Sequence, residues 1–120
     1  MNDTLERLKS GKLIGSKSLK LACGLKEFPI EILALSETLE FLDLSDNQMT
    51  VLPASFSKLK KLKIVFFARN SFTIFPTVLR ECTALTMIGF KSNQIHTVEE
   101  NAFPPMLRWL ILTDNKIESL

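Results

Sequence analysis

The sequence lacks the features that would indicate a membrane span or a nucleic-acid partner. Its 120 residues include no tyrosine and only one histidine, and the formal net charge is +2. No apolar run approaches the length of a membrane span, which is about 20 residues, and the amino terminus has no small-residue cleavage site of a signal peptide. The lysines are not interleaved with aromatic residues in a basic stripe. The composition therefore predicts one soluble, cytoplasmic unit that binds neither nucleic acid nor membrane.

Cysteine is also scarce. Cys23 and Cys82 are too few and too far apart in sequence for a disulfide framework or a tetrahedral zinc site. Free cysteine is often buried, so we expect both thiols to be reduced and to pack as small apolar side chains at or near the core.

Catalytic motifs are missing as well. The stretch GKLIGSKS, residues 11–18, has three residues between its glycines and lacks the Gly-Lys-Ser/Thr ending of a phosphate-binding loop. No kinase glycine-rich loop, Asp-Phe-Gly or catalytic-loop motif occurs. His96 has no matched nucleophile or carboxylate, so we expect it on the surface, and the pair Glu99 and Glu100 should be solvated. The sequence predicts no enzyme, no cofactor and no metal site.

What the sequence does contain is an internal repeat. Four asparagines lie 23, 23 and 22 residues apart, and their neighbourhoods agree. The four units read LEFLDLSDNQMTVLP from Leu39, LKIVFFARNSFTIFP from Leu62, LTMIGFKSNQIHTVE from Leu85 and LRWLILTDNKIESL from Leu107. Apolar residues occupy the first, fourth, sixth, eleventh and fourteenth places of every unit. An earlier unit, LKLACGLKEFPIEIL from Leu19, fits with one residue missing before Phe28, and Gly24 lies about where asparagine would be.

Each unit predicts a strand and a return segment. Leu42 and Leu44 point one way while Phe41 and Asp43 point the other, which is the period of a strand buried on one face. Stacked strands would form a parallel sheet, whose inner row we expect to be Leu42/Leu44, Val65/Phe67, Ile88/Phe90 and Leu110/Leu112. Pro53 and Pro76 suit the first position of short helices in the return segments. Pro104 and Pro105 rule out a regular helix in the fourth return, AFPPM.

The two ends of the repeat array are predicted to differ. Residues 1–15 should form a helical cap, with Asn2, Asp3 or Thr4 at its start, Gly11 as its stop, and Leu5 and Leu8 covering the first repeat. Residues 16–120 should hold about five repeats, the first degenerate and the last incomplete. The last unit stops at Leu120, so we expect either a longer solenoid or a homodimer formed through this open end.

The repeated asparagines are predicted to be structural. Each follows a strand at a bend, where its amide can bond backbone groups of its own turn and of the adjacent one. The expected ladder consists of Asn47, Asn70, Asn93 and Asn115.

A binding face is predicted between the leucines, on the concave side of the sheet. Third-place residues are all apolar, and fifth-place and seventh-place residues lie beside them. The candidate partner-binding residues are Phe41, Asp43, Ile64, Phe66, Met87, Lys91, Trp109 and Ile111. We expect Phe66 and Trp109 to be the anchors, because large aromatic side chains dominate interface energetics. The alternative is that these exposed side chains pack on one another without a partner.

The repeats resemble those of the leucine-rich-repeat family. More narrowly, LKLACGLKEFPIEI, TLEFLDLSDNQMTVLP, GFKSNQI and PPMLRWLILTDNKIESL are similar to the amino-terminal repeats of bacterial leucine-rich-repeat proteins that carry a protein-kinase domain after the solenoid. The resemblance implies an α/β solenoid, a right-handed β-α superhelix with a parallel sheet on its concave face and short helices or turns on its convex face. It also implies a recognition or regulatory role toward a protein partner, with any kinase downstream of this chain.

Overall fold

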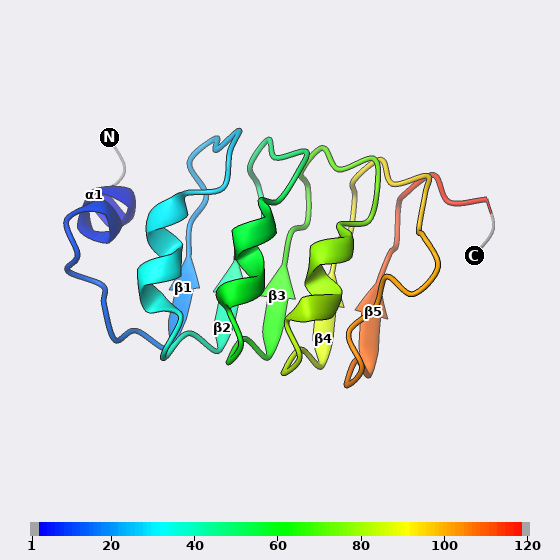
Figure 1. The fold of residues 1–120 in the computed structure, drawn as a ribbon. Helices are drawn as coiled ribbons and strands as arrows, with labels where there is room; N and C mark the ends of the chain where they lie inside the picture. The colour runs from blue at the N-terminus through cyan, green and yellow to red at the C-terminus, as the bar shows by residue number, and fades with distance from the viewer. Residues whose placement is uncertain (1–2, 119–120) are drawn as a thin grey trace.

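Five short parallel strands, one from each turn of the chain, form a single sheet. The computed structural model describes residues 3–118, and the sheet follows the chain in the order β1-β2-β3-β4-β5 (Figure 1). The strands are β1 (Ser18–Lys20), β2 (Phe41–Asp43), β3 (Ile64–Phe66), β4 (Met87–Gly89) and β5 (Trp109–Ile111). We call the turns that carry them coil 1 (residues 16–38), coil 2 (39–61), coil 3 (62–84), coil 4 (85–106) and coil 5 (107–118). The predicted α/β leucine-rich-repeat solenoid is confirmed.

The strand register matches the repeat register in coils 2 to 5. Phe41 pairs with Ile64, Ile64 with Met87, and Met87 with Trp109. In the first unit, Leu19 pairs with Leu42, which occupies the fourth place. The alignment of Leu21 with Leu44 is therefore confirmed, and coil 1 begins three residues before Leu19.

Coil 1 is one residue short between Leu21 and Leu25. The backbone N–H of Leu25 donates to Asn47 Oδ1 at 2.9 Å, just as the N–H of Met49 donates to Asn70 Oδ1 at 3.0 Å. Leu25 therefore occupies the eleventh place of its coil. The missing residue predicted before Phe28 is confirmed, and it falls before Leu25.

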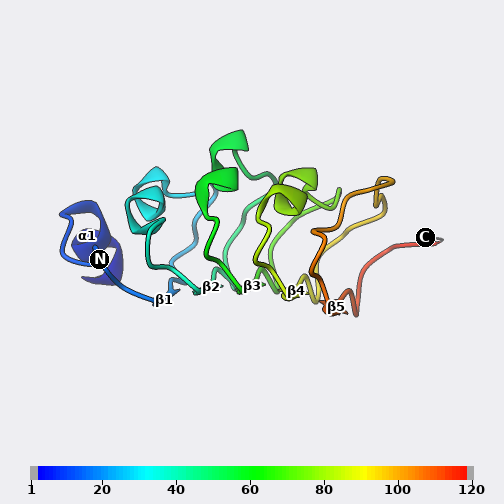
Figure 2. The same ribbon diagram turned by 60° about the horizontal axis from the view of Figure 1, so that its bottom comes forward.

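Short 3₁₀ helices form the outer side of the first three coils: η1 (Ile30–Leu35), η2 (Ala54–Lys58) and η3 (Thr77–Glu81). Figure 2 shows the strands along the inner side of a shallow arc and the helices along its outer side. The prediction that Pro53 and Pro76 begin the helices was wrong by one residue. Both prolines have extended backbone, with ψ of 156° and 113°, and the helices start at the next residue. Coil 4 has no helix in residues 101–106, as its two prolines predict.

The amino-terminal helix α1 (Asp3–Lys9) packs against coil 1 at one end of the solenoid (Figure 1). Leu8 is 3% exposed and belongs to the common core, and Leu5 packs against it. Gly11 has a φ of +83°. Its N–H donates to Leu8 O at 3.2 Å, and the next N–H donates to Arg7 O at 3.0 Å. These two bonds form a Schellman motif, which favours glycine because of its positive φ.

The expected start of this helix needs correction. Asp3 and Thr4 lie within α1, so neither is the residue that precedes it. The third candidate, Asn2, lies outside the described residues, as does Leu120, on which the expectation of an open end was based.

The core runs the length of the sheet and is rich in phenylalanine. Fourth-place and sixth-place side chains of coils 2 to 4 are all 0% exposed: Leu42, Leu44, Val65, Phe67, Ile88 and Phe90. The rings of Phe67 and Phe90 stack with centroids 5.1 Å apart, and Phe72 meets the Phe90 ring edge-on at 5.1 Å. Such pairs contribute about 0.5–1.5 kcal/mol beyond area burial. In coil 5 the equivalent Leu110 and Leu112 are only partly buried.

The two cysteines differ in environment. Cys82 is 0% exposed, and its Sγ lies 3.5 Å from Phe56 O. Burial raises the pKa of the Cys82 thiol to about 12, so this thiol stays protonated at neutral pH. The expectation that Cys23 lies at or near the core was wrong. Cys23 is exposed because it lies in the shortened bend after β1, between the core-facing sixth place, Leu21, and the core-facing eleventh place, Leu25.

The asparagine side chains join neighbouring coils through their backbones. Asn70 Nδ2 donates to Leu44 O in the preceding coil at 2.9 Å and to Phe67 O in its own coil at 3.2 Å. Its Oδ1 accepts the N–H of Met49, again from the preceding coil, at 3.0 Å. The other three asparagines make the equivalent bonds to the coils before them. Asn47, Asn70 and Asn93 are 6–8% exposed, so these amides satisfy backbone groups that water does not reach.

We predict that Asn70→Leu lowers the free energy of unfolding by about 1–3 kcal/mol for each buried backbone group left without a partner. Met49 N–H and Leu44 O are the two groups that would lose their bond. Urea unfolding followed by circular dichroism measures the change. Gln94→Leu is the matched control, because Gln94 is exposed. Equal stability of Asn70→Leu and the unaltered chain would contradict a structural role for the ladder.

Candidate functional site

The side chains on the free face of the sheet form rows that cross the strands. Phe41, Ile64 and Met87 are half-buried and Trp109 is 54% exposed. Their backbones are direct partners in the register, so the side chains lie about 4.8 Å apart along the row. Ser18 of β1 begins the row with a hydroxyl. The third-place residues of β2 to β5 therefore form one continuous apolar row.

Phe66 lies beside this row and covers Gly89 on the next strand. A Cβ atom built on Gly89 would lie 2.7 Å from Phe66 Cδ1 and 3.2 Å from Cε1. The Phe66 ring thus occupies the space that any other residue at position 89 would fill. Phe41 meets the same ring edge-on, with centroids 5.8 Å apart and an interplanar angle of 71°. Packing within the face therefore fixes the orientation of Phe66.

Trp109 and Ile111 extend the apolar surface onto the last strand. Trp109 is 54% exposed and Ile111 is 38% exposed. The guanidinium carbon of Arg108 lies 5.8 Å from the centroid of the Trp109 ring, within the range of a cation–π contact. Arg108 thus holds the Trp109 ring on one side, and the rest of the ring is a large exposed surface for a partner.

Charged groups surround the apolar row. Asp43 Oδ1 accepts the N–H of Ser45 at 2.9 Å, so this carboxylate is partly committed within its own coil. Ser45, in the seventh place, is 7% exposed, and its Oγ accepts the N–H of Ala68 at 3.0 Å. Lys20 and Lys91 are exposed and form no ion pair within residues 3–118. Lys91 is the one predicted partner-binding residue that is both charged and free.

The bend after each strand forms a rim along the free face. The residue in the eighth place has a positive φ in four coils, between 53° and 62°, at Asp46, Arg69, Ser92 and Asp114. Aspartate tolerates this conformation, but arginine and serine give no such signal in a sequence. The positive φ of the eighth place is therefore not evident from the sequence.

Side chains along the rim pair between coils. Arg69 Nε and Nη2 donate to the two oxygens of Asp46 at 2.5 and 3.0 Å. This hydrogen-bonded pair lowers the pKa of the Asp46 carboxyl and raises the pKa of Arg69. Ser92 Oγ likewise donates to Asp114 Oδ2 at 2.8 Å. Both pairs are exposed, so they order the rim and contribute little to stability.

The described residues show no arrangement suited to catalysis. His96 is exposed and its Nδ1 lies 2.8 Å from Thr97 Oγ1, while Glu99 and Glu100 are exposed. Residues 3–118 contain no group of three histidine, cysteine, aspartate or glutamate side chains that could hold a metal ion. Across the same range, no helix combines the length and the apolar character needed to cross a membrane.

Comparison with known proteins supports this fold. Residues 38–59 match the family model described as Leucine Rich Repeat. The chain is 30% identical over 93 residues to the human PH domain leucine-rich repeat-containing protein phosphatase 1, and 29% identical to the mouse protein. The match covers 76% of this chain and 5% of the length of each of these relatives.

Two solved structures have similar folds. A leucine-rich-repeat protein of Leptospira interrogans superposes with a TM-score of 0.76 at 24% identity, over 92% of this chain and 29% of that one. The plant peptide hormone receptor RGFR1, in complex with RGF2, gives a TM-score of 0.70 at 25% identity, over 90% of this chain and 18% of that one. The chain is therefore a leucine-rich-repeat solenoid, a fold that serves generally in protein–protein interaction.

We predict that Gly89→Ala displaces the Phe66 ring and breaks its contact with Phe41. The ring can turn toward solvent, so the free energy of unfolding should fall by only about 1 kcal/mol, at the low end of overpacking costs. Urea unfolding and nuclear Overhauser contacts between the two rings measure the change. In a Phe66→Ala background the same glycine substitution should cost little. An equal cost in both backgrounds would contradict the packing described.

Proposed function

We propose that the free face of the sheet binds a partner protein through its apolar row. The observation that carries this proposal is the continuous row of Phe41, Ile64, Met87 and Trp109, which ends on a tryptophan that is 54% exposed. Exposed apolar rows of this kind mark interaction surfaces. Phe66 and Trp109 are held by neighbouring groups, so a partner loses less side-chain entropy in ordering them.

Positive charges outnumber negative ones around the row and suit a partner with apolar anchors and acidic neighbours. Lys20, Lys91 and Arg108 contribute positive charge, and Asp43 and Asp114 contribute negative charge. The plant receptor with a similar fold was solved in complex with RGF2, which supports a recognition role for solenoids of this kind.

The wider context is also part of the proposal. We infer that the repeats are the amino-terminal recognition or regulatory part of a longer cytoplasmic protein. The matched proteins are much longer than this chain, which supports the inference that the repeats belong to a longer protein. Two free cysteines are consistent with a reducing compartment. A downstream kinase rests on the sequence resemblance alone, and no catalytic role is proposed for this chain.

We predict that Phe66→Ser combined with Trp109→Ser weakens partner binding by at least about 30-fold, equivalent to about 2 kcal/mol. A partner identified by capture on the immobilised chain is purified, and its affinity is measured by calorimetry. The control combines Ile14→Ser with Met106→Ser, which removes two apolar side chains that are 64% and 61% exposed outside the sheet. Circular dichroism should be unchanged in both variants. Unchanged affinity in the first variant would refute the assignment.

The second candidate function is self-association through coil 5. Its inner side chains Leu110 and Leu112 are partly exposed, whereas their equivalents in coils 2 to 4 are fully buried. The edge of β5 has no strand beside it among residues 3–118, and such an edge can pair with a second copy.

We predict that self-association through coil 5 produces a homodimer whose population rises with concentration in sedimentation equilibrium. Leu110→Lys should abolish the dimer, because it places a charge at the buried centre of the contact. Met106→Lys is the control, since Met106 is already 61% exposed. A monomer at high concentration would rule out self-association and leave partner binding as the function.

A further inference from the structure

Neighbouring coils differ in how closely they pack along the segments that lead from the strands to the return segments. We call residues 49–53, 72–76 and 95–99 the flank segments of coils 2, 3 and 4. Between coils 3 and 4, Phe75 N–H donates to Thr97 O at 3.0 Å and His96 N–H donates to Thr73 O at 2.9 Å. These bonds accompany a parallel bridge between Ile74 and Thr97.

The same bonds are missing between coils 2 and 3. The equivalent pairs are Leu52 N–H with Ile74 O and Thr73 N–H with Thr50 O, and neither is joined in the part of the chain that the structure describes. Two amide donors and two carbonyl acceptors beside the gap thus lack the bonds that their equivalents make between coils 3 and 4. We call this gap the wedge.

The return segments explain why the wedge opens there. Strands lie about 4.8 Å apart on the inner side, whereas helices with their side chains are about 10 Å across. Coils 2 and 3 both carry helices, η2 and η3, which pack side by side and spread the coils on the outer side. Coil 4 returns through Pro104 and Pro105 without a helix, so its flank segment can lie against that of coil 3.

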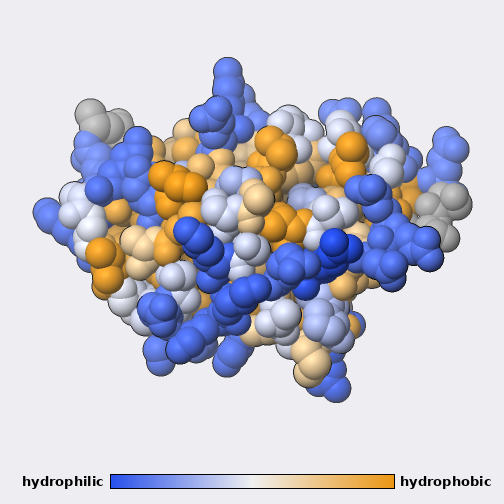
Figure 3. Space-filling view, in the orientation of Figure 1, coloured by the Kyte–Doolittle hydropathy of each residue, from blue (hydrophilic) through white to orange (hydrophobic). Residues whose placement is uncertain are grey.

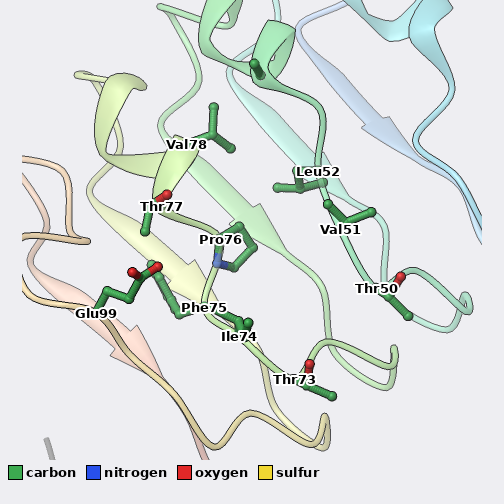
Figure 4. A pocket seen from close by; sticks show the side chains of 11 residues that line it. Thr50, Val51, Leu52, Thr73, Ile74, Phe75, Pro76, Thr77, Val78 and Glu99 are labelled. Carbon is green, nitrogen blue, oxygen red and sulfur yellow. The ribbon is translucent and has the colours of Figure 1, made fainter.

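The wedge is a cavity of about 470 Å³. Figure 4 shows Val51 and Leu52 on one side of it and Ile74 and Pro76 on the other. Val51 is 67% exposed and Ile74 is 48% exposed, while Phe75 beneath them is fully buried. In Figure 3 apolar patches lie in the upper half of the helix-bearing face, and hydrophilic side chains form a band across its lower half. The wedge therefore has apolar walls.

One acidic side chain stands at the rim. Glu99 lines the cavity beside Thr77, is exposed, and makes no ion pair with any residue of 3–118. No lysine, arginine or histidine lines the cavity. The rim therefore favours a positive charge on whatever occupies the wedge.

We propose that the wedge binds an extended peptide segment of a partner protein, in which an aliphatic side chain is followed by lysine or arginine. Ser71 N–H donates to Met49 O at 2.9 Å and joins the coils at the inner end of the flank segments, so the peptide lies along the mouth of the wedge, where its backbone can bond Leu52 N–H or Ile74 O. The aliphatic side chain enters between Val51 and Ile74, and the basic residue meets Glu99. This site lies outside the free face of the sheet and does not depend on it.

The test uses a fluorescein-labelled, capped hexapeptide of alternating lysine and isoleucine. Two matched peptides replace lysine by glutamate or isoleucine by serine. Fluorescence anisotropy gives the affinities, and ¹⁵N-resolved spectra of the chain locate the bound peptide. We expect the lysine–isoleucine peptide alone to bind, and the amide resonances of Leu52 and Thr73 to shift on binding.

Paired variants of the chain then test the named contacts. Ile74→Ser should raise the dissociation constant at least tenfold, whereas Ile14→Ser, at a site 64% exposed outside the wedge, should leave it unchanged. Glu99→Gln should weaken binding where Glu100→Gln does not. The Phe66→Ser, Trp109→Ser variant should keep full affinity, which separates this site from the free face of the sheet.

Several results would overturn the proposal. These are failure of the lysine–isoleucine peptide to bind, equal binding of the glutamate peptide, equal weakening by Ile14→Ser, or shifts confined to strand residues. Leu52 and Thr73 resonances that move with protein concentration alone would show that a second copy fills the wedge, which also overturns it.

Discussion

The structure depends on one hydrogen-bonded group, the side-chain amide of the repeated asparagine. Each amide has both donor and acceptor capacity, so a single residue satisfies the carbonyls of two coils and an amide of the preceding one. A shift of one residue between coils would break these bonds and turn the leucines of a strand toward solvent. The asparagines therefore fix the register in which the inner rows stack. Because the bonds run between coils, no single repeat can satisfy its own buried backbone, and stability is a property of the stack.

That register holds the inner side at strand spacing, and the outer side must then adapt. The coils are wider on the outer side wherever a helix forms the return segment. Phenylalanines fill the widening interior, with Phe67 and Phe90 stacked beneath the sheet and Phe72 and Phe75 packed around them. Where two helix-bearing coils meet, the widening exceeds what hydrogen bonds between the flank segments can span, and a gap remains. A constant inner spacing thus gives a variable outer surface.

Features that the same kind of residue marks at the same place in every repeat could be predicted from the sequence, including the asparagine bonds between coils, and contacts particular to one coil or one pair of coils could not. The strands, the inner rows and the absence of a helix at Pro104 follow from local pattern. The exposure of Cys23 does not, because it depends on where coil 1 is one residue short, and the strand pairing was needed to locate that place. Arg69 and Ser92 adopt positive φ because the coil geometry requires it of the eighth place, whatever residue stands there. The cover of Gly89 by Phe66 involves two residues 23 positions apart in sequence, and neither residue alone indicates the contact.

The two surfaces considered for binding therefore have different origins. On the free face of the sheet, side chains define the surface, so substitutions there change what is bound without changing the scaffold. In the wedge, side chains line the walls, but the opening itself follows from the helices in both neighbouring return segments. A helix-breaking change in a return segment would close or move that opening and leave the sheet register intact, since the asparagine amides hold the inner side independently. One scaffold can in this way vary a surface on its inner face and a surface on its flank by separate changes in sequence.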